Sequence, residues 1–255
     1  MAANIFSEKH QILFYETDRT RRVTPGMLVN ILMLASQDQS DELGLTSQKI
    51  HAQDLGWVVT QHLLTIERLP QLKEKVIVKT QATAYNHYFC YRDFWLEDQT
   101  GEVLAKMHST FILMDQEKRK ITKVPTELIA PYGSEYTPKV ERVAEPEKFN
   151  LEKMSASKDY RVRFMDIDAN QHVNNVHYFD WIVDALSEEF LINHQIKQVN
   201  VRYKREVHYG ELVTSRVDQP LTVKDSKMSI THHQIVVDQQ ESCRAQCLWE
   251  KNENQ

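Results

Sequence analysis

The 255-residue sequence predicts an α+β fold made of two similar halves, each with one helix followed by a run of antiparallel strands. Three observations support this prediction: an internal repeat, an amphipathic helix pattern in each half, and strand-like runs after each helix. Hydrophobic residues make up 41% of the chain and charged residues 26%, so it has enough apolar side chains to form a core.

The repeat is clearest around an aspartate in each half. When the sequence is shifted by 150 residues (168 − 18 = 150), Asp18 aligns with Asp168 and Val23 with Val173. Apolar residues then recur at i, i+3, i+4 and i+7 in both halves, the spacing of one helix face; they are Leu28, Ile31, Leu32 and Ala35, and Tyr178, Trp181, Ile182 and Ala185. Each half therefore starts with a short strand, a loop containing the aspartate, and an amphipathic helix.

Runs of β-branched and aromatic residues follow each helix and predict antiparallel strands. Charged or turn-forming residues separate these runs, and "DQTGE" and "DQQES" occupy equivalent places as hairpin turns. The predicted strand regions are 56–69, 75–85, 88–98 and 102–115 in the first half, and 197–207, 211–223, 227–238 and 242–251 in the second.

The stretch 134–153 is rich in proline and glutamate and has few large apolar residues, which predicts a linker. We therefore expect one domain at residues 1–133 and a second at residues 154–255. A single helix leaves much of a curled sheet uncovered, and two such units side by side would bury that surface as a dimer does.

Composition excludes several classes of protein. The N-terminus lacks the pattern of a signal peptide, and no stretch approaches the roughly 18 apolar residues of a membrane span. The three cysteines, Cys90, Cys243 and Cys247, predict a reducing cytoplasm rather than a disulfide framework. The net charge of −5 argues against nucleic acid as the main partner, and no glycine-rich nucleotide motif is present.

No cofactor or metal site is predicted. Cys243 and Cys247 should share one strand face with Ala245, as buried small residues without a second pair of zinc ligands. His232 and His233 should point to opposite faces of a strand, which makes them a poor metal pair.

The second half carries a candidate catalytic loop that the first half lacks. It has Asp168, Asn170 and His172, whereas Thr20 and Arg22 stand where Asn170 and His172 would be. A loop that only capped a helix could keep the same residues in both copies, although these residue types are also ordinary in loops and caps. Histidine is the commonest general acid/base, a carboxylate can orient it, and an asparagine amide can donate to an oxyanion.

A helix should begin near Asn174 or Asn175, both good N-cap residues. The unpaired backbone N–H groups of its first turn can receive a carbonyl oxygen that becomes negative, so the arrangement suits acyl transfer. His177 is expected early in this helix without a ligand role, and Asp166 and Asp180 as loop and helix-surface carboxylates.

At residues 166–182, "DIDANQHVNNVHYFDWI" closely resembles the signature of acyl-acyl carrier protein (ACP) thioesterases, the plant plastid enzymes and their bacterial relatives. Residues 56–70, 91–125 and 199–211 also resemble segments of this family, in the family's order. The resemblance implies a tandem hotdog fold, in which each repeat is a long helix wrapped by a curved antiparallel sheet. It also implies hydrolysis of the thioester of fatty acyl-ACP, which releases free fatty acid and terminates fatty acid synthesis.

The resemblance also implies which residues are catalytic. The family's Asp, Asn and His fall on Asp168, Asn170 and His172, and its later Glu falls on Glu206, 206 − 172 = 34 residues downstream. Plant members often have a cysteine after that Glu; Val207 stands there in this chain, which argues against a thiolate nucleophile. Asn174 is one substrate-binding candidate. By analogy with the family's acyl pocket in the first domain, Trp57 and the apolar residues at 28–34 are others, and simple core packing explains each of these equally well.

Other functions remain open at this point. They are an acyl-coenzyme A thioesterase, a hotdog dehydratase with another histidine–carboxylate layout, and a non-catalytic acyl-binding module, against which the four retained site residues argue. Basic clusters at 18–22, at 117–123 and at Lys139 with Arg142 are either solvated surface or a docking site for an acidic carrier protein. The sequence leaves a homodimer open.

Overall fold

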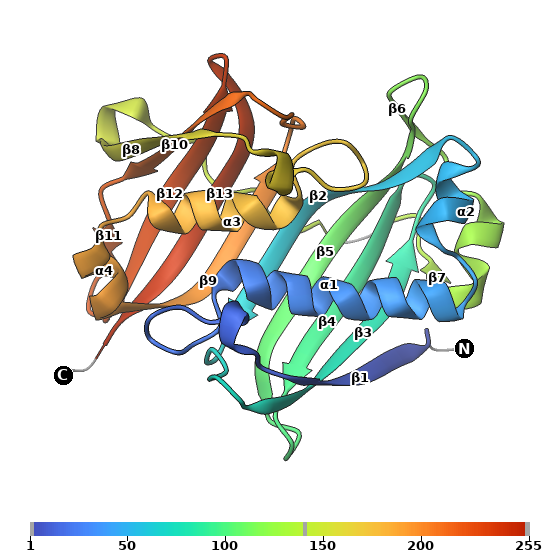
Figure 1. Ribbon diagram of the computed structural model, residues 1–255, viewed down its shortest axis with the longest axis horizontal. Coiled ribbons are helices and arrows are strands. Elements are labelled where there is room, and N and C mark those ends of the chain that lie inside the picture. Colours follow the sequence, from blue (N-terminus) through green and yellow to red (C-terminus); the bar gives the residue numbers. More distant parts are fainter. Residues whose placement is uncertain (1–2, 140–141, 253–255) are drawn as a thin grey trace. The chain divides into compact units, whose positions relative to one another are not determined.

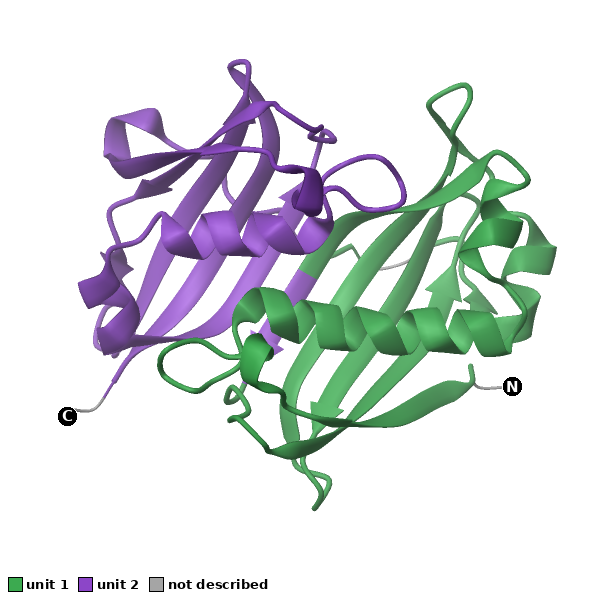
Figure 2. Cartoon of the chain, in the orientation of Figure 1, with its two compact units in different colours: residues 1–62, 67–143 green, residues 63–66, 144–255 purple. Residues whose placement is uncertain are grey.

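The computed structural model describes residues 3–139 and 142–252. It divides into two compact units (Figure 2), the first comprising residues 1–62 and 67–143 and the second residues 63–66 and 144–255. The change of unit between residues 143 and 144 falls within the stretch predicted as a linker.

The first unit is a helix against an antiparallel sheet with the strand order β1-β3-β4-β5-β2. Short strands β6 and β7 pair with β5 and β3. The elements are β1 (Ile5–Gln11), η1 (Phe14–Glu16), α1 (Pro25–Glu42), α2 (Ser47–His51), β2 (Leu55–Ile66), β3 (Lys75–Tyr85), β4 (Phe89–Glu97), β5 (Val103–Asp115), β6 (Lys120–Thr122), η2 (Thr126–Leu128), η3 (Ala130–Tyr132) and β7 (Glu135–Tyr136).

The second unit repeats this plan, with the strand order β8-β10-β12-β13-β9 and the short strand β11 paired with β12. Its elements are η4 (Leu151–Lys153), β8 (Met154–Arg161), η5 (Phe164–Asp166), α3 (Asn175–Asp184), α4 (Glu188–Asn193), β9 (His194–Tyr203), β10 (Leu212–Asp218), β11 (Leu221–Thr222), β12 (Met228–Val237) and β13 (Gln240–Lys251). In both units the strand before the aspartate loop lies at the outer edge of the order, so the two halves have one topology. The α+β prediction and the tandem hotdog architecture are confirmed.

Each main helix covers one face of its own sheet, α1 over β1, β3 and β4 and α3 over β10 and β12 (Figure 1). The helix residues predicted to face the core are buried, with exposures from 0% for Leu28 to 7% for Trp181. Apolar residues of the strands that these helices cover, such as Val78, Phe94, Val213 and Ile235, are fully buried as well. Burial of these side chains between helix and sheet is the main source of stability in each unit.

The second helix is shorter than the long helix expected for each repeat. Helix α1 has 18 residues, whereas α3 has 10. The chain restarts as α4 because the Ser187 side chain caps a new helix by accepting the Phe190 N–H at 3.2 Å.

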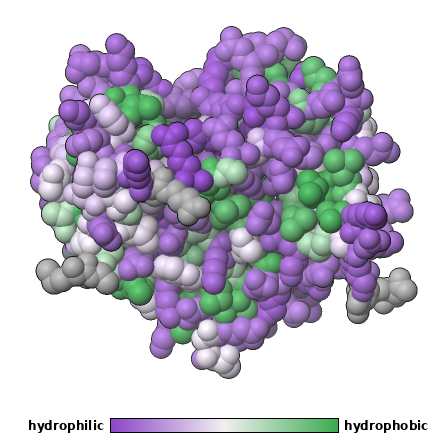
Figure 3. Space-filling view, turned by 180° about the vertical axis from the view of Figure 1, so that it is seen from behind, coloured by the Kyte–Doolittle hydropathy of each residue, from purple (hydrophilic) through white to green (hydrophobic). Residues whose placement is uncertain are grey.

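The surface in Figure 3 is mostly hydrophilic on the face shown, and hydrophobic residues form separate patches there. None of the helices in the described ranges combines the length and the apolar character needed to cross a membrane.

Candidate active site

The loop that carries Asp168, Asn170 and His172 is a tight turn closed by its own backbone. The Asp168 N–H donates to the His172 carbonyl and the Gln171 N–H donates to the Asp168 carbonyl, both at 3.0 Å. Ile167 and Val173 form a β-bridge across the base of the turn. Gln171 has φ = +66°, so the turn holds a non-glycine residue in the left-handed region. The three predicted site residues therefore lie within one closed turn of five residues.

The Asp168 carboxylate organises this turn. Its Oδ1 accepts the backbone N–H of Asn170 at 2.8 Å, and its Oδ2 lies 3.5 Å from the Asn170 side-chain Nδ2. Asn170 is exposed and Asp168 is half-buried. The amide that could donate to a substrate carbonyl is thus placed directly beside the carboxylate.

The His172 ring is held in one tautomer. Its Nδ1 lies 3.1 Å from the Val173 carbonyl, and because a carbonyl only accepts, Nδ1 carries the proton. In the neutral ring Nε2 is then the basic nitrogen. A ring oriented in this way can act as a general base through Nε2.

Glu206 is brought to the loop by its neighbours in the chain. The sequence placed it on a strand, but β9 ends at Tyr203 and Glu206 lies three residues later in an irregular segment. The Val173 N–H donates to the Val207 carbonyl at 2.8 Å, and His208 Nδ1 donates to the Gln171 carbonyl at 3.3 Å. These bonds hold the Glu206 segment against the loop that carries the candidate site residues.

Helix α3 begins where the sequence predicted. Asn174 is the N-cap, and its Oδ1 accepts the Val176 N–H at 3.2 Å. Capping uses the oxygen of this side chain and leaves Nδ2 as the group that could contact a substrate.

Trp57, the other substrate-binding candidate, lies on β2 in the first unit. It is half-buried and packs against a cluster formed by Ile50, Leu113 and Leu128. This is a core environment, and a role in an acyl pocket stays a prediction.

The aspartate loop of the first unit has the same backbone. The Asp18 N–H donates to the Arg22 carbonyl at 3.0 Å, the Arg21 N–H to the Asp18 carbonyl at 2.9 Å, and Arg21 has φ = +62°. The Thr20 N–H and hydroxyl both donate to Asp18 Oδ1, at 2.7 and 2.6 Å. The degree of burial also matches residue by residue between 11–35 and 161–185, except that Asp168 is less exposed than Asp18.

The first unit has a leucine in the place of Glu206. After β2, the backbone N–H groups of Glu67 and Arg68 both donate to the Leu104 carbonyl. After β9, the N–H groups of Lys204 and Arg205 both donate to the Ser242 carbonyl in the same way. Two residues after Arg68, the Pro70 carbonyl accepts the Val23 N–H. Two residues after Arg205, the Val207 carbonyl likewise accepts the Val173 N–H. Counting between these bonds places Leu69 opposite Glu206. The first unit thus lacks all three of the side chains Asn170, His172 and Glu206.

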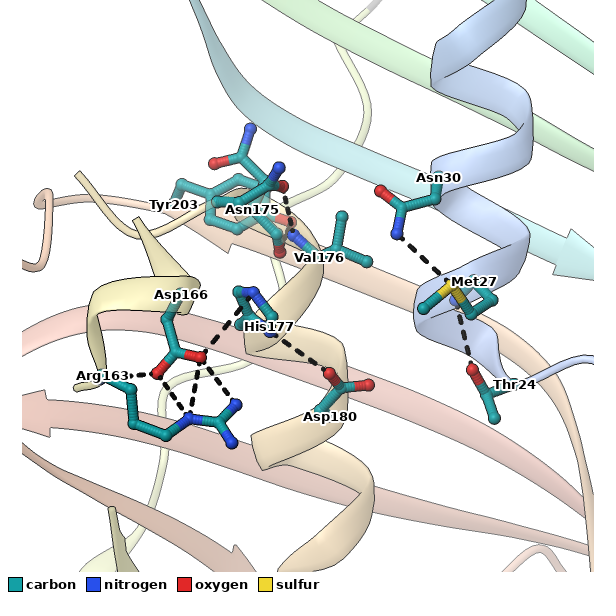
Figure 4. Close-up of polar contacts among 11 residues, drawn as sticks. Thr24, Met27, Asn30, Arg163, Asp166, Asn175, Val176, His177, Asp180 and Tyr203 are labelled. Carbon is teal, nitrogen blue, oxygen red and sulfur yellow. Dashed lines mark hydrogen bonds and ion pairs between the residues drawn. The ribbon is translucent and has the colours of Figure 1, made fainter. Parts of the chain in front are cut away.

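Asp166 was expected to be a loop carboxylate but is 3% exposed. Its carboxylate accepts from the Arg163 backbone N–H at 2.8 Å and from the Arg163 guanidinium at 2.7 Å, as Figure 4 shows. Burial opposes ionisation of Asp166, but these hydrogen bonds prevail and hold its pKa below the usual value. The burial of Asp166 could have been predicted from Glu16, because both halves of the sequence have an acid at this equivalent position.

His177 lies between two carboxylates at the start of α3. Its Nε2 is 3.9 Å from Asp166 and its Nδ1 is 3.5 Å from Asp180, which is exposed on the helix surface as predicted (Figure 4). The equivalent residues of α1 are Met27 and Asn30, which contact each other without charge.

The two cysteines and two histidines of strands β12 and β13 lie as predicted from the sequence. Cys243 and Cys247 are fully buried beside Ala245 on β13, and burial raises the pKa of both thiols. His232 bonds Asp218 at 2.7 Å, and His233 bonds Thr231 at 2.8 Å. Within residues 3–139 and 142–252, no group of three or more His, Cys, Asp or Glu side chains could hold a metal ion.

Two family models match the chain. The model of the acyl-ACP thioesterase N-terminal domain matches residues 3–132, and that of the acyl-ACP thioesterase C-terminal domain matches residues 150–251. A dodecanoyl-[acyl-carrier-protein] hydrolase of Cinnamomum camphora is 28% identical over 227 residues, which are 83% of this chain and 58% of that protein. The chain therefore spans less than two thirds of the length of this plant relative.

Solved structures agree with this match. A protein assigned as an oleoyl thioesterase from Lactobacillus plantarum has 42% identity and a TM-score of 0.96, covering 99% of this chain and 98% of that one. The 12:0-ACP thioesterase from Umbellularia californica has 22% identity and a TM-score of 0.86, covering 97% and 94%, and supports the fold alone.

Proposed function

This chain belongs to the acyl-ACP thioesterase family, and on that premise we propose that it hydrolyses the thioester bond of fatty acyl-ACP and releases the free fatty acid. The observation that carries the proposal is the difference between two loops with one backbone. Only the second loop has Asn170 and His172, and only there does the adjoining segment carry a glutamate, Glu206, at the position that Leu69 occupies in the first half. When a repeated protein keeps one active site, we expect both copies to share the loop backbone and only one copy to carry the reactive side chains.

In this proposal Asp168, His172 and Glu206 hold and activate the attacking water. His172 is the general base, because its Nδ1 proton is committed to the Val173 carbonyl and Nε2 is basic. Asp168 fixes the loop geometry through Asn170, and Glu206 supplies the second carboxylate beside the loop. After attack, the protonated His172 delivers its proton to the departing thiolate.

The thioester carbonyl is held by amide donors. Asn170 Nδ2 and the backbone N–H groups at the start of α3 provide partial positive charge where the carbonyl oxygen becomes negative. The Asn174 amide lies at the same helix start and is the proposed substrate-binding group there.

Two chemical routes fit these residues: direct attack by water, and a covalent acyl-aspartate intermediate at Asp168. Single-turnover hydrolysis in heavy-oxygen water distinguishes them. Label in the Asp168 carboxylate rules out direct attack and establishes the covalent route. Label only in the fatty acid fits either route, since water can attack the acyl carbon of the intermediate, so direct attack also requires that mass spectrometry of the rapidly quenched reaction shows no acyl-enzyme.

The carrier protein is the proposed partner, and an acyl-coenzyme A thioesterase is the alternative substrate assignment. A hydrolysis screen over acyl-ACPs of graded chain length, with matched coenzyme A esters in parallel, tests both. Higher kcat/KM for the carrier-bound substrates supports the proposal, and higher values for the coenzyme A esters replace it. Binding without thiol release would instead indicate a non-catalytic acyl-binding module.

The basic clusters remain candidates for carrier docking. Lys118 is paired with Asp115 at 2.8 Å, and the Arg142 guanidinium lies 5.6 Å from the centre of the Phe89 ring, so both already have neighbours in the first unit. Charge reversal at a true docking cluster should raise KM for the carrier-bound substrate but not for a small thioester.

A cytoplasmic location and a homodimer are further proposals. The three cysteines are free, which fits a reducing compartment. Size-exclusion chromatography with light scattering tests the dimer directly.

A further inference from the structure

A tyrosine hydroxyl joins the end of strand β9 to the start of helix α3. Tyr203, the last residue of β9, donates its O–H to the carbonyl of Asn175, the first residue of α3, at 3.1 Å. Figure 4 shows the Tyr203 ring lying beside Asn175 and Val176. The bond spans 28 residues of sequence, so it fixes two segments that chain connectivity leaves independent.

Each of these segments leads directly to proposed site residues. Asn170 and His172 lie in the loop that runs into α3, and Glu206 follows Tyr203 by three residues. Two further hydrogen bonds join the segments on the other side of Glu206 in the chain: the Val173 N–H donates to the Val207 carbonyl, and His208 Nδ1 donates to the Gln171 carbonyl. The Tyr203 hydroxyl therefore constrains the distance between the helix start and the glutamate segment from the other side of the site.

The tyrosine ring reinforces the same junction. It packs edge-on against the Tyr178 ring in the first turn of α3, with centroids 5.2 Å apart and planes at 88°. Burial, together with neighbouring negative charge that includes Glu206, raises the pKa of Tyr178, so Glu206 lies within electrostatic reach of this turn. Burial also raises the pKa of Tyr203, and its hydroxyl stays protonated as a donor at neutral pH.

The first unit shows that the fold does not need this hydrogen bond. Counting from the matched backbone bonds that follow β2 and β9, the residue equivalent to Tyr203 is Ile66, and the shift of 150 residues makes Leu28 equivalent to Tyr178 and Pro25 to Asn175. Ile66, which belongs to the segment 63–66 grouped with the second unit, has no donor and cannot form the link, yet the first unit keeps the same turn and the same helix start. The hydroxyl occurs only in the unit that also carries Asn170, His172 and Glu206.

We propose that Tyr203 is a positioning residue for thioester hydrolysis: its hydroxyl sets the start of α3, and with it the Asn170–His172 loop, relative to Glu206. The inference rests on the proposed function, since it assigns a role within that site. Tyr203 itself takes no part in proton transfer. It acts by limiting the relative movement of two elements whose side chains must meet the same thioester, and misplacement of about 1 Å can slow an enzyme a hundredfold.

The test is Tyr203→Phe, which keeps the ring and its contact with Tyr178 and removes only the hydroxyl. The matched control is Ser215→Ala, because the fully buried Ser215 hydroxyl donates to the Trp181 carbonyl of the same helix at 2.9 Å, six residues beyond Asn175. Both variants lose one hydroxyl-to-α3 hydrogen bond, and only the first loses it beside the site. kcat and KM are measured with acyl-ACP, and the thermal midpoint of each variant is recorded.

We expect Tyr203→Phe to lower kcat about tenfold with KM within twofold of wild type, and Ser215→Ala to keep kcat within twofold at a similar loss of thermal midpoint. A kcat for Tyr203→Phe within twofold of wild type overturns the proposal. Equal losses of kcat in both variants also overturn it, because they show a structural role alone.

A second variant guards against misfolding. Tyr178→Leu with Tyr203→Ile installs the residues found at the equivalent positions 28 and 66 of the first half of the sequence; it should fold and show the same or a larger loss of kcat, and full activity in it refutes the proposal. If wild-type protein releases no thiol from any acyl-ACP, the proposed function fails. If wild type is active and both Tyr203 variants match it, only this inference fails.

Discussion

The loop at residues 16–24 and the loop at residues 166–174 have matching backbone hydrogen bonds and different side chains. In each, the N-cap residue donates its N–H to the carbonyl of a buried acid, Thr24 to Glu16 at 3.1 Å and Asn174 to Asp166 at 2.9 Å. Each loop also has an aspartate that accepts the N–H two residues later. The two loops nevertheless present threonine and arginine in one unit and asparagine and histidine in the other.

This difference separates the residues that build the turn, which we call the frame, from the residues that distinguish the reactive loop. The buried acid, the aspartate and the N-cap residue build the turn in both units, so their presence does not mark activity. The side chains that differ between the loops, and Glu206 opposite Leu69, are the ones that mark the second loop as the reactive one; Asp168 acts with them there, whereas Asp18 has no such neighbours. Variants that convert one loop into the other test this assignment.

The largest effect is expected from His172→Ala. Loss of the general base should reduce kcat by about 10²–10⁴-fold, measured with a small chromogenic thioester so that carrier docking is not involved. The matched variant Arg22→Ala changes the equivalent residue of the first loop and should leave kcat within twofold. Comparable losses in the two variants would show that both loops take part.

Glu206→Leu gives the second unit the residue of the first. Removal of the carboxylate should lower kcat by about 10²-fold or more, and the isosteric Glu206→Gln should lose a similar amount because the charge is needed rather than the volume. Activity of Glu206→Gln within fivefold of wild type would remove Glu206 from the site.

Asn170→Thr copies Thr20 and should keep the turn intact. A threonine can retain the backbone N–H bond to Asp168, as Thr20 does with Asp18, so the thermal midpoint should change by no more than a few degrees. Loss of one donor to the oxyanion should lower kcat about 10–10²-fold with KM little changed. An unchanged kcat would exclude Asn170 as a carbonyl donor.

The smallest of these effects concerns the buried acids of the frame. Asp166→Asn and Glu16→Gln should each cost about 1–3 kcal/mol of unfolding free energy, because a buried charge-assisted hydrogen bond is lost. Only Asp166→Asn should also reduce kcat, by roughly a few-fold, since of the two acids it alone supports the proposed catalytic loop. Equal kcat in the two variants would show that the frame tolerates the change.

The Asp166 contribution should also depend on pH. Its pKa in the folded protein lies below the usual 3.8, so its stabilisation is present above pH 3.8 and is lost as the pH falls through the lower folded value. Urea unfolding of wild type and Asp166→Asn at a series of acidic pH values should show the two curves converging. A constant difference between them would contradict this linkage.

Much of the fold could be predicted from the sequence, because hydrophobic periodicity and the shift of 150 residues locate both helices and both loops. The residue of the first half that is equivalent to Glu206 could not be found with that shift. Glu206 corresponds to Leu69 at a spacing of 206 − 69 = 137 residues, since the first unit has 13 more residues between the loop and this position (150 − 137 = 13). A long α1 and a separate α2 account for part of that insertion.

Burial of polar side chains and long-range contacts could not be predicted from the sequence either. Asp166 and Asp180 look alike as acids near a helix start, yet one is buried on Arg163 and the other is exposed. Tyr203 falls within the predicted strand 197–207, and nothing in local spacing shows that its hydroxyl reaches Asn175. Such contacts depend on how the strands and the helix pack.

The most direct test of a single active site in the second unit is acyl-ACP hydrolysis by the double variant Asn170→Thr/His172→Arg, which turns the second loop into the first. We expect a thermal midpoint within a few degrees of wild type, since the first loop already adopts this backbone, and no measurable release of fatty acid. Hydrolysis at a rate near that of wild type would contradict the assignment of the chemistry to this loop.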